Sequence, residues 1–402
     1  MAFPTAVSAN TGLAYTANRG NRTVSVIDTV KGATTANVQV ATSGWASPSD
    51  VAVSPDGTRA YAANPDSRSV SVIDTATNTV TATVALAVAG TTLAVSPDGK
   101  KVYVTGQGTG SVTVIDTATN TVSTKILVVG YENMALTPNG SRLYVSQWSE
   151  RSIAVIDTTT NKLIATVPTN GGCQGLAAHP DGTRVYVAGN EARSVFVINT
   201  ATNAITHSIG VGTPPTCVAV NPNGSGVYVG CEDGPVSLID SVGNKVVATV
   251  PLFDVTALAV SPNGTFVYAP DFSTHTLSVI DTTSNTVTGT VAVGANPCSV
   301  TFGPGVPLTT ATPTVVKGTP LKVRYSTMPG NVSGKNWVGL YPDDGGATVG
   351  TKNSFHWAYA PNAAGSVTLD TGSVPAPGRY TVWYLYNDSY TAIAGPLTIT
   401  VT

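Results

Sequence analysis

Apolar and polar positions alternate in short runs along most of the chain, and the runs recur with a regular period. In residues 69–73, valine and isoleucine alternate with serine, as in a strand with one buried face. Each repeat also contains a strand that begins near a tyrosine, and successive tyrosines lie 40 to 46 residues apart: Tyr15, Tyr61, Tyr103, Tyr144, Tyr186, Tyr228 and Tyr268. A period of this length built only of strand-like segments predicts an all-β fold, a seven-bladed β-propeller.

Residues 47–86 illustrate the order of strands and turns expected in one blade. Residues 51–53 form the innermost strand, and a Ser-Pro-Asp-Gly turn at residues 54–57 leads into the second strand at 60–63. The third strand covers residues 69–73 and the Thr-rich fourth strand residues 79–84. An alanine at the middle of each inner strand suits the crowded axis: Ala6, Ala52, Ala94, Ala135, Ala177, Ala219 and Ala259.

A carboxylate or its amide analogue ends each third strand, and we expect it to cap the turn that follows through backbone hydrogen bonds. The residues are Asp28, Asp74, Asp116, Asp157, Asn199, Asp240 and Asp281. They lie one per blade in the outer half, too far apart to share an ion. We therefore predict no metal site and no cofactor.

The inner-strand pattern occurs once more than the other strands. Residues 5–8 match it near the N-terminus, and residues 297–302 match it again after the last complete repeat. Seven blades need only one of the two, and the sequence does not decide which one closes the ring.

The Ser-Pro-Asp-Gly turn, the Tyr-Val strand and the Val-Ile-Asp-Thr strand, recurring in register over residues 3–303, resemble the YVTN-type β-propeller repeat family. The resemblance implies an extracellular or cell-surface bacterial protein, usually without assigned chemistry. More distant propellers with a similar repeat include lactonases and lyases, whose catalytic histidine and acidic clusters have no evident counterpart in this sequence.

The composition changes after residue 305, so we predict a propeller at residues 1–305 and a second domain at 306–402. Seven short strand-like runs separated by Gly, Pro and Asn favour an immunoglobulin-like β-sandwich. The runs are 314–316, 321–325, 337–341, 355–359, 366–369, 378–386 and 397–401. The Trp-Val-Gly and Pro-Gly-Arg-Tyr motifs at residues 337–339 and 377–380 resemble SKICH-type modules, which implies a binding or spacer role. Trp357 and Trp383 are expected in its core.

The charge and hydropathy of the chain limit the kinds of partner and location expected for the protein. Charged residues make up 10% of the chain, the formal net charge is −2, and the basic residues are scattered, which excludes an electrostatic nucleic-acid binder. No apolar run is long enough to span a bilayer. The Thr-rich, weakly charged composition favours a secreted or cell-surface protein whose signal peptide has been removed. A cytosolic protein stays open, and we expect a monomer.

Four cysteines, Cys173, Cys217, Cys231 and Cys298, match no zinc-binding spacing. Cys217 and Cys231 flank a turn between two antiparallel strands, which makes a cross-strand disulfide between them geometrically possible. Cys173 and Cys298 begin inner strands and are expected to be small buried residues.

Ligands of propellers usually bind where the variable loops of one face converge around the central channel. Polar and aromatic residues interrupt the repeat in those loops and form a plausible platform for a glycan or a peptide: Trp45, Tyr131, Glu132, Asn133, Trp148, Glu150, Arg151, Glu191, Arg193 and Phe253. The alternative is that these aromatics seal gaps between blades and that the charged residues form solvated ion pairs.

We expect a non-catalytic recognition protein that binds a protein or glycan partner, because no acid–base cluster stands out. The alternative is a secreted lyase, lactonase or hydrolase with its active site in the propeller mouth. Its best candidate residues are His275, Asp254, Asp271 and Glu232.

Overall fold

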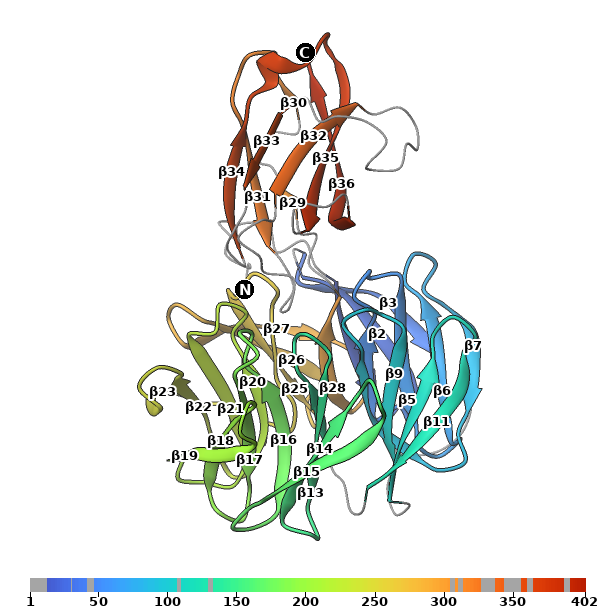
Figure 1. Ribbon diagram of the computed structural model, residues 1–402, viewed down its shortest axis with the longest axis vertical. Coiled ribbons are helices and arrows are strands. Elements are labelled where there is room, and N and C mark those ends of the chain that lie inside the picture. The colour runs from blue at the N-terminus through green and yellow to red at the C-terminus, as the bar shows by residue number, and fades with distance from the viewer. Residues whose placement is uncertain are drawn as a thin grey trace. The chain divides into compact units, whose positions relative to one another are not determined.

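The computed structural model (Figure 1) describes residues 13–29, 31–41, 47–106, 110–128, 133–303, 308–309, 314–326, 337–342, 356–359, 364–386 and 391–402. The chain divides into two compact units, of which the larger includes Gly12–Pro304 and the smaller Gly305–Thr402. Each unit is considered by itself below.

The larger unit is a seven-bladed β-propeller, as the repeat predicts, and each blade is a four-stranded antiparallel sheet. Blade 1 contains β28 (Pro297–Phe302), β1 (Leu13–Asn18), β2 (Thr23–Asp28) and β3 (Ala33–Gln39). Blade 2 contains β4 (Asp50–Val53), β5 (Arg59–Asn64), β6 (Ser69–Asp74) and β7 (Thr79–Ala85). Blade 3 contains β8 (Gly90–Val95), β9 (Lys101–Gly106), β10 (Ser111–Asp116) and β11 (Thr121–Leu127).

The remaining blades repeat the same order from the axis outward. Blade 4 has β12 (Met134–Leu136), β13 (Arg142–Gln147), β14 (Ser152–Asp157) and β15 (Lys162–Pro168). Blade 5 has β16 (Cys173–Ala178), β17 (Arg184–Gly189), β18 (Ser194–Asn199) and β19 (Ala204–Gly210). Blade 6 has β20 (Pro215–Val220), β21 (Gly226–Cys231), β22 (Gly234–Asp240) and β23 (Lys245–Val250). Blade 7 has β24 (Ala259–Val260), β25 (Phe266–Asp271), β26 (Thr276–Asp281) and β27 (Thr286–Ala292).

The ring is closed by the second of the two surplus inner strands. β28 pairs antiparallel with β1, with Thr301 opposite Tyr15 and Val300 opposite Thr16. Blade 1 is therefore assembled from segments separated by most of the propeller sequence, which joins the two ends of the ring. The other surplus pattern, residues 5–8, lies outside the described residues.

The hydrophobic core lies between neighbouring blades. All seven repeat tyrosines are almost completely buried, with at most 2% of the surface of each exposed. Tyr61 of blade 2, for example, packs in one cluster with Val102 and Val104 of blade 3. Burial of this apolar surface is the main stabilising term, and it also raises the pKa of Tyr268 to about 12. Adjacent blades are thus held together largely by the side chains that define the repeat.

The acidic residue at the end of each third strand caps its turn as predicted. Asp116 Oδ1 accepts hydrogen bonds from the amides of Ala118 (3.0 Å) and Thr119 (2.9 Å). Asn199 makes the same two contacts in blade 5. The turn also holds an asparagine in the left-handed region, such as Asn120 with φ 54°, a conformation that asparagine tolerates better than most residues.

The smaller unit contains two sheets. One has the order β29 (Leu308–Thr309), β31 (Leu321–Ser326), β34 (Ala364–Leu369), and the other β30 (Thr314–Val315), β36 (Thr391–Val401), β35 (Gly378–Tyr386), β32 (Trp337–Pro342), β33 (His356–Tyr359). A 3₁₀ turn, η1, covers Thr371–Ser373. Buried residues of both sheets, including Val323, Leu340 and Val382, form one cluster. The side chains of Trp357 and Trp383 lie outside the described part of the structure.

Nothing in the described ranges of the chain is a helix of the length and apolarity needed to cross a bilayer.

Candidate functional site

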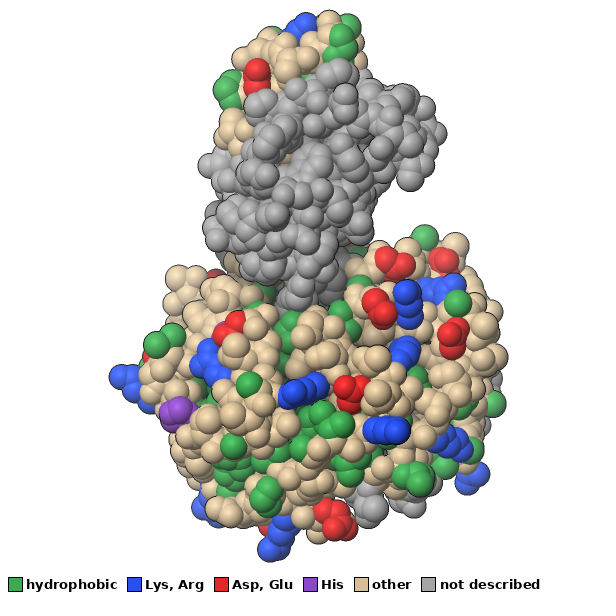
Figure 2. Space-filling model, in the orientation of Figure 1, with side chains coloured by type: hydrophobic (Ala, Val, Ile, Leu, Met, Phe, Trp, Pro, Cys, Tyr) green, Lys and Arg blue, Asp and Glu red, His purple; other side chains and the backbone are tan. Residues whose placement is uncertain are grey.

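The strand order gives the propeller two distinct faces. The turns between first and second strands and between third and fourth strands lie on one side, which we call the far face. The loops between second and third strands, and those leading to the next blade, lie on the other side, which we call the mouth face. Figure 2 shows charged side chains scattered over the visible surface of the propeller, with no large region of one sign. A candidate site on the propeller therefore depends on individual residues of the mouth face.

Asp50 is the first residue of β4, and in the strands as described it is the only carboxylate in an inner strand. Its Oδ2 atom accepts a hydrogen bond from the amide of Leu93 in blade 3 (2.8 Å), and its Oδ1 atom accepts one from Val51 (2.9 Å). Burial raises the pKa of Asp50 to about 6, although these two amides and the Ser299 hydroxyl favour the ionised form. The carboxyl group therefore changes charge close to neutral pH.

Arg19 lies beside the same part of the ring, in the loop between β1 and β2. Its Nε atom is buried and has no hydrogen-bond partner among the described residues. The guanidinium lies next to the Cys298 thiol, whose pKa is raised to about 11 by burial despite the favourable charge of Arg19. Cys298 Sγ in turn lies 3.4 Å from the carbonyl oxygens of Pro48 and Ser49 in blade 2. Arg19, Cys298 and Asp50 therefore gather at the inner edge of blades 1 and 2.

This arrangement suits acid–base chemistry more than nucleophilic chemistry. A carboxyl group with a pKa near neutrality can both accept and return a proton during a reaction. A guanidinium with an unused donor can stabilise a developing negative charge. The thiol of Cys298 stays protonated at neutral pH, because burial holds its pKa near 11, so it is a poor nucleophile.

The sequence reasoning missed Asp50. The available signal was a carboxylate at a position where the other inner strands carry small or neutral residues: Thr92, Asn133, Gly175, Cys217, Ala257 and Ser299. Asn133 belongs to the predicted binding set, and its Oδ1 atom accepts the amide of Met134 (2.9 Å) as Asp50 accepts that of Val51.

The predicted catalytic residues lie on mouth-face loops of blades 6 and 7. The Nδ1 atom of His275 accepts the amide of Asn296 (3.1 Å), so that nitrogen is occupied. Asp271 Oδ1 accepts the amides of Ser273 and Thr274 and caps its own loop. Asp254 and Glu232 are exposed, and within the described residues no hydrogen bond or ion pair joins either side chain to His275.

Several predicted binding residues meet between blades 4 and 5. Trp148 lies against the backbone of Gly172, where an added Cβ would be 2.6 Å from the indole. Arg151 forms an ion pair with Glu191 (3.3 Å), and the same Glu191 oxygen accepts the amide of Gly172 (3.1 Å). These contacts agree with the alternative interpretation of the sequence, in which the Trp148 ring fills the gap between blades 4 and 5.

Other predicted binding residues are not brought into that group. Glu150 and Arg193 are exposed, and 56% of the surface of Phe253 is exposed on the loop between β23 and β24. Trp45, Tyr131 and Glu132 lie outside the described residues. In the described part of the chain, no group of three or more His, Cys, Asp or Glu residues could hold a metal ion.

The proposed pairing of Cys217 with Cys231 is wrong in this structure, because all four cysteines are free. A register shift places Cys217 opposite Gly230, while Cys231 lies opposite Pro215. Cys217 packs among residues of blades 6 and 7, whereas Cys231 packs among residues of blades 5 and 6. The two thiols therefore face opposite sides of one sheet and cannot bond without a backbone rearrangement.

Comparison with known proteins supports the propeller and adds one functional indication. The family model "Lactonase, 7-bladed beta-propeller" matches residues 5–128, which is less than half of the chain. No curated protein matches the sequence.

Solved structures share the fold at low sequence identity. Hydrazine synthase from Kuenenia stuttgartiensis aligns with a TM-score of 0.60 at 22% identity, covering 67% of this chain and 92% of that one. A functionally unknown protein from Desulfotomaculum acetoxidans aligns with a TM-score of 0.65 at 16% identity, covering 72% and 98%. A Bacteroides uniformis protein described as a candidate 6-phosphogluconolactonase aligns with a TM-score of 0.62 at 15% identity, covering 73% and 99%. At these identities the likeness concerns the fold alone.

Proposed function

We propose that this protein hydrolyses a lactone at the mouth of the propeller, between blades 1 and 2. The observation that carries the proposal is Asp50, a carboxyl group with a pKa of about 6 at the inner edge of blade 2. The neighbouring Cys298 thiol also lies beside the Arg19 guanidinium. The partial match to a lactonase family model and the fold shared with a candidate 6-phosphogluconolactonase support the same reading. They favour this alternative over the non-catalytic role that the sequence suggested first.

The chemistry uses one water molecule and restores the enzyme. Ionised Asp50 removes a proton from water while the water oxygen bonds to the lactone carbonyl carbon. Arg19 donates hydrogen bonds to the resulting oxyanion. When the intermediate collapses, the ring C–O bond breaks and the departing oxygen takes the proton from Asp50. The product is the open hydroxy acid, whose carboxyl proton passes to solvent.

The test is proton release from a panel of γ- and δ-lactones, including δ-gluconolactone and γ-butyrolactone. Asp50→Asn removes the base and should lower kcat by about 100-fold or more, and Arg19→Gln should lower it by a similar factor. Asp98→Asn is the matched control, because Asp98 caps a far-face turn of blade 3 by accepting the Ser96 hydroxyl (2.6 Å). Turnover that survives both mouth variants would exclude these residues. A wild-type protein that opens no lactone would remove the function itself.

A second function, recognition of a protein or glycan partner, is favoured by exposed aromatic residues on the mouth face. Phe253 and Phe272 expose 56% and 48% of their surfaces on loops that lead into and cross blade 7. Exposed rings beside carboxylates such as Asp254 could stack on a sugar and hydrogen-bond its hydroxyl groups. Glycan and peptide arrays test this with the Phe253→Ala/Phe272→Ala double variant. Val242→Ala, which alters an exposed far-face residue, is its control. Equal binding by the double variant and the control would argue against the platform.

We further propose that the propeller belongs to the YVTN-type repeat family and that the smaller unit is an immunoglobulin-like sandwich. The in-register repeat motifs support the first assignment, and the two sheets around one core support the second. A secreted or cell-surface location and a monomeric state complete this proposal. Fractionation of the native host and light scattering of the purified protein test these two points.

A further inference from the structure

A short segment between β27 and β28 contacts mouth-face loops of two neighbouring blades. Asn296, its last residue, has a left-handed backbone with φ 56°. The carbonyl oxygen of Asn296 accepts the amide of Arg19 (3.0 Å), and that of Ala295 accepts the amide of Gly20 (2.9 Å). This segment therefore holds the backbone of Arg19, the residue whose guanidinium donates to the oxyanion in the proposed reaction.

The loop between β25 and β26 of blade 7 holds Asn296 from the other side. The amide of Asn296 donates to His275 Nδ1 (3.1 Å), and its Nδ2 atom donates to the carbonyl oxygen of Phe272 (3.1 Å). The carbonyl oxygen of His275 accepts the amide of Val293 (3.0 Å), which fixes the loop to the same segment. Hydrogen bonds thus run from His275 through Asn296 to Arg19, and we call this set the mouth-face link.

Close packing couples the two halves of the link. A Cβ atom added at Gly20 would lie 2.3 Å from Asn296 Oδ1 and 2.8 Å from the Ala295 side chain. The backbone of residue 20 is therefore in contact with the Asn296 side chain. Because groups packed this closely do not move independently, a displacement of Asn296 is transmitted to the backbone beside Arg19.

The contact at Nδ1 fixes where the His275 imidazole carries its proton. A backbone N–H group can only donate a hydrogen bond, so Nδ1 accepts one and carries no hydrogen. The neutral ring then has its proton on Nε2. A second proton would bind Nδ1 and face the hydrogen of the Asn296 amide. Protonation of His275 therefore breaks the mouth-face link.

The charged groups around the link are of both signs. Asp271, at the start of the loop of His275, interacts with the imidazole through its negative charge. Arg19 and Arg22 lie on the loop of blade 1 that contacts Asn296. The carboxylate favours an added proton on the ring and the two guanidinium groups oppose it. Within the described residues, the hydrogen bond to Nδ1 comes from the Asn296 amide.

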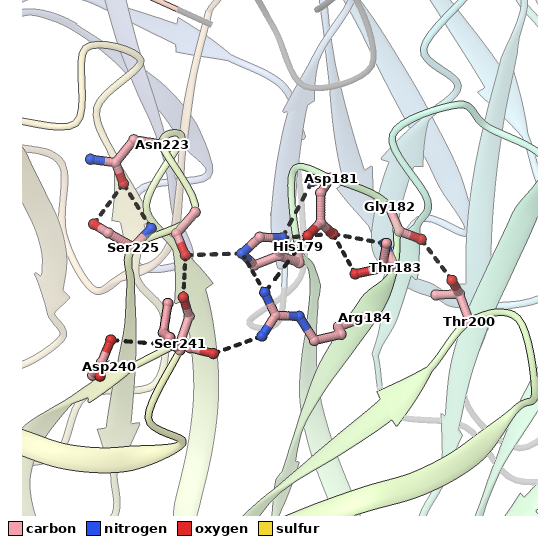
Figure 3. A network of polar contacts seen from close by, with 12 residues as sticks. His179, Asp181, Gly182, Thr183, Arg184, Thr200, Asn223, Ser225, Asp240 and Ser241 are labelled. Carbon is pink, nitrogen blue, oxygen red and sulfur yellow. Dashed lines mark hydrogen bonds and ion pairs between the residues drawn. The ribbon is translucent and has the colours of Figure 1, made fainter. Parts of the chain in front are cut away.

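His179 on the far face has the opposite arrangement (Figure 3). Its Nε2 atom lies 2.9 Å from Gly224 O and 3.2 Å from Arg184 Nη2. Its Nδ1 atom lies 2.8 Å from Asp181 Oδ1. Both ring nitrogens of His179 face an oxygen atom, so a proton added to either one finds an acceptor. Acidification should therefore preserve this contact between blades 5 and 6.

We propose that His275 and Asn296 are positioning residues for Arg19, and that protonation of His275 releases Arg19 from its position at the site. The effect on turnover rests on the lactone hydrolysis proposed above, whereas the link itself does not depend on any activity. While His275 is neutral, the link is complete and the backbone of Arg19 is fixed. Once the ring is protonated, Asn296 loses one of its two contacts with the loop of blade 7.

Amide hydrogen exchange of the intact protein, followed by NMR, tests the link without a substrate. From about pH 8 to about pH 4.5, a range over which histidines as a class gain a proton, the protection factors of Arg19, Gly20 and Asn296 should fall about tenfold. Residues 221–226, beside His179, are the internal reference and should keep their protection. Protection of the link that does not change with pH would overturn the proposal.

The matched variant is His275→Asn. Asparagine offers an oxygen in place of Nδ1, tolerates the left-handed φ of 61° at this position and does not titrate. Its link amides should therefore keep their protection at both pH values. The titration of Asp50 is common to the two proteins and cancels in the comparison. An equal fall in the variant and the wild type would show that His275 is not the cause.

Turnover of δ-gluconolactone tests the positioning role. At about pH 8, His275→Ala should lower kcat about tenfold with little change in KM, because Arg19 acts on the transition state. His275→Asn restores an acceptor and should recover most of that loss. Ser273→Ala, an exposed change in the same loop, is the control.

The two measurements separate the possible failures. An unchanged kcat in His275→Ala, in an enzyme that opens the lactone, would overturn the positioning role. A wild-type protein that opens no lactone would remove the proposed function, and the exchange measurement would still decide whether His275 controls the link. The wild-type exchange comparison needs no substitution, so it holds even if a variant fails to fold.

Discussion

The Asp50 carboxylate and the Leu93 amide lie 2.8 Å apart and join blade 2 to blade 3 beside the central channel. Other inner strands carry an uncharged residue at the position of Asp50. A carboxylate there is costly to ionise, because burial removes it from water. A carboxyl group whose pKa is raised toward neutrality can both give and take a proton at neutral pH.

Asp50 should make stability depend on pH in a defined direction. Burial raises its pKa from 3.8 to about 6 in the folded protein, so the folded state holds the proton more tightly than the unfolded state. The free energy of unfolding should therefore decrease as the pH rises from about 4 to about 6. Asp50→Asn removes the ionisation and should be more stable than wild type by up to about 3 kcal/mol above this range. Urea denaturation below about pH 4 and above about pH 6 measures the difference in free energy of unfolding between the variant and the wild type. A difference that does not vary with pH would show that the ionisation of Asp50 is not its cause.

Lactone hydrolysis should follow the same ionisation. The general base must be deprotonated, so kcat/KM should rise with pH and reach half its plateau near the pKa of about 6. Initial rates must be corrected for spontaneous ring opening, which increases in alkali. The correction comes from reactions without enzyme at each pH. If the midpoint of the kcat/KM profile lies far from pH 6, the general base is a group other than Asp50.

Gly172 and Trp148 should be energetically coupled. Gly172→Ala places a methyl group 2.6 Å from the indole and should destabilise the protein by about 1–3 kcal/mol. In a Trp148→Ala background the space is open, so the same substitution should cost much less. A double-mutant cycle by chemical denaturation gives the coupling energy. Additive effects of the two substitutions would show that the ring does not press on Gly172 in solution.

The cysteines should behave as four free thiols, of which three are buried and Cys298 is partly buried. Burial raises the pKa of Cys217 to about 12 and that of Cys173 to about 11, so little thiolate forms at neutral pH. A thiol reagent should react slowly with the native protein and with all four residues after denaturation. Reducing agent should leave the Tm unchanged. Recovery of only two reactive thiols from unreduced, denatured protein would indicate a disulfide.

Much of the propeller could be predicted from the sequence, because its elements depend on near neighbours along the chain. The alternation of Val and Ser at residues 69–73 places one face of a strand in the core whichever blade lies next to it. The acidic residue after Val-Ile, such as Asp116, finds its hydrogen-bond donors two and three residues later. These local rules repeat seven times, and the structure confirms them.

The candidate site could not be predicted in the same way. His275 and Asp271 are conspicuous in the sequence, yet their side chains accept hydrogen bonds from nearby backbone amides. Asp50 is inconspicuous, and its pKa depends on Leu93 in the next blade and on Ser299 near the end of the ring. The disulfide prediction failed for a related reason, since a register shift decides which side of the sheet each thiol faces.

By itself, the sequence determined the strands, their turns and the number of blades, because hydrophobic alternation and turn geometry act over a few residues. Only the tertiary structure decided that β28 closes the ring, that Asp50 meets the Leu93 amide and that Asn296 joins the loops of His275 and Arg19. The physical reason is that burial, pKa and contacts between blades come from groups far apart in the chain, which the closed ring brings into contact.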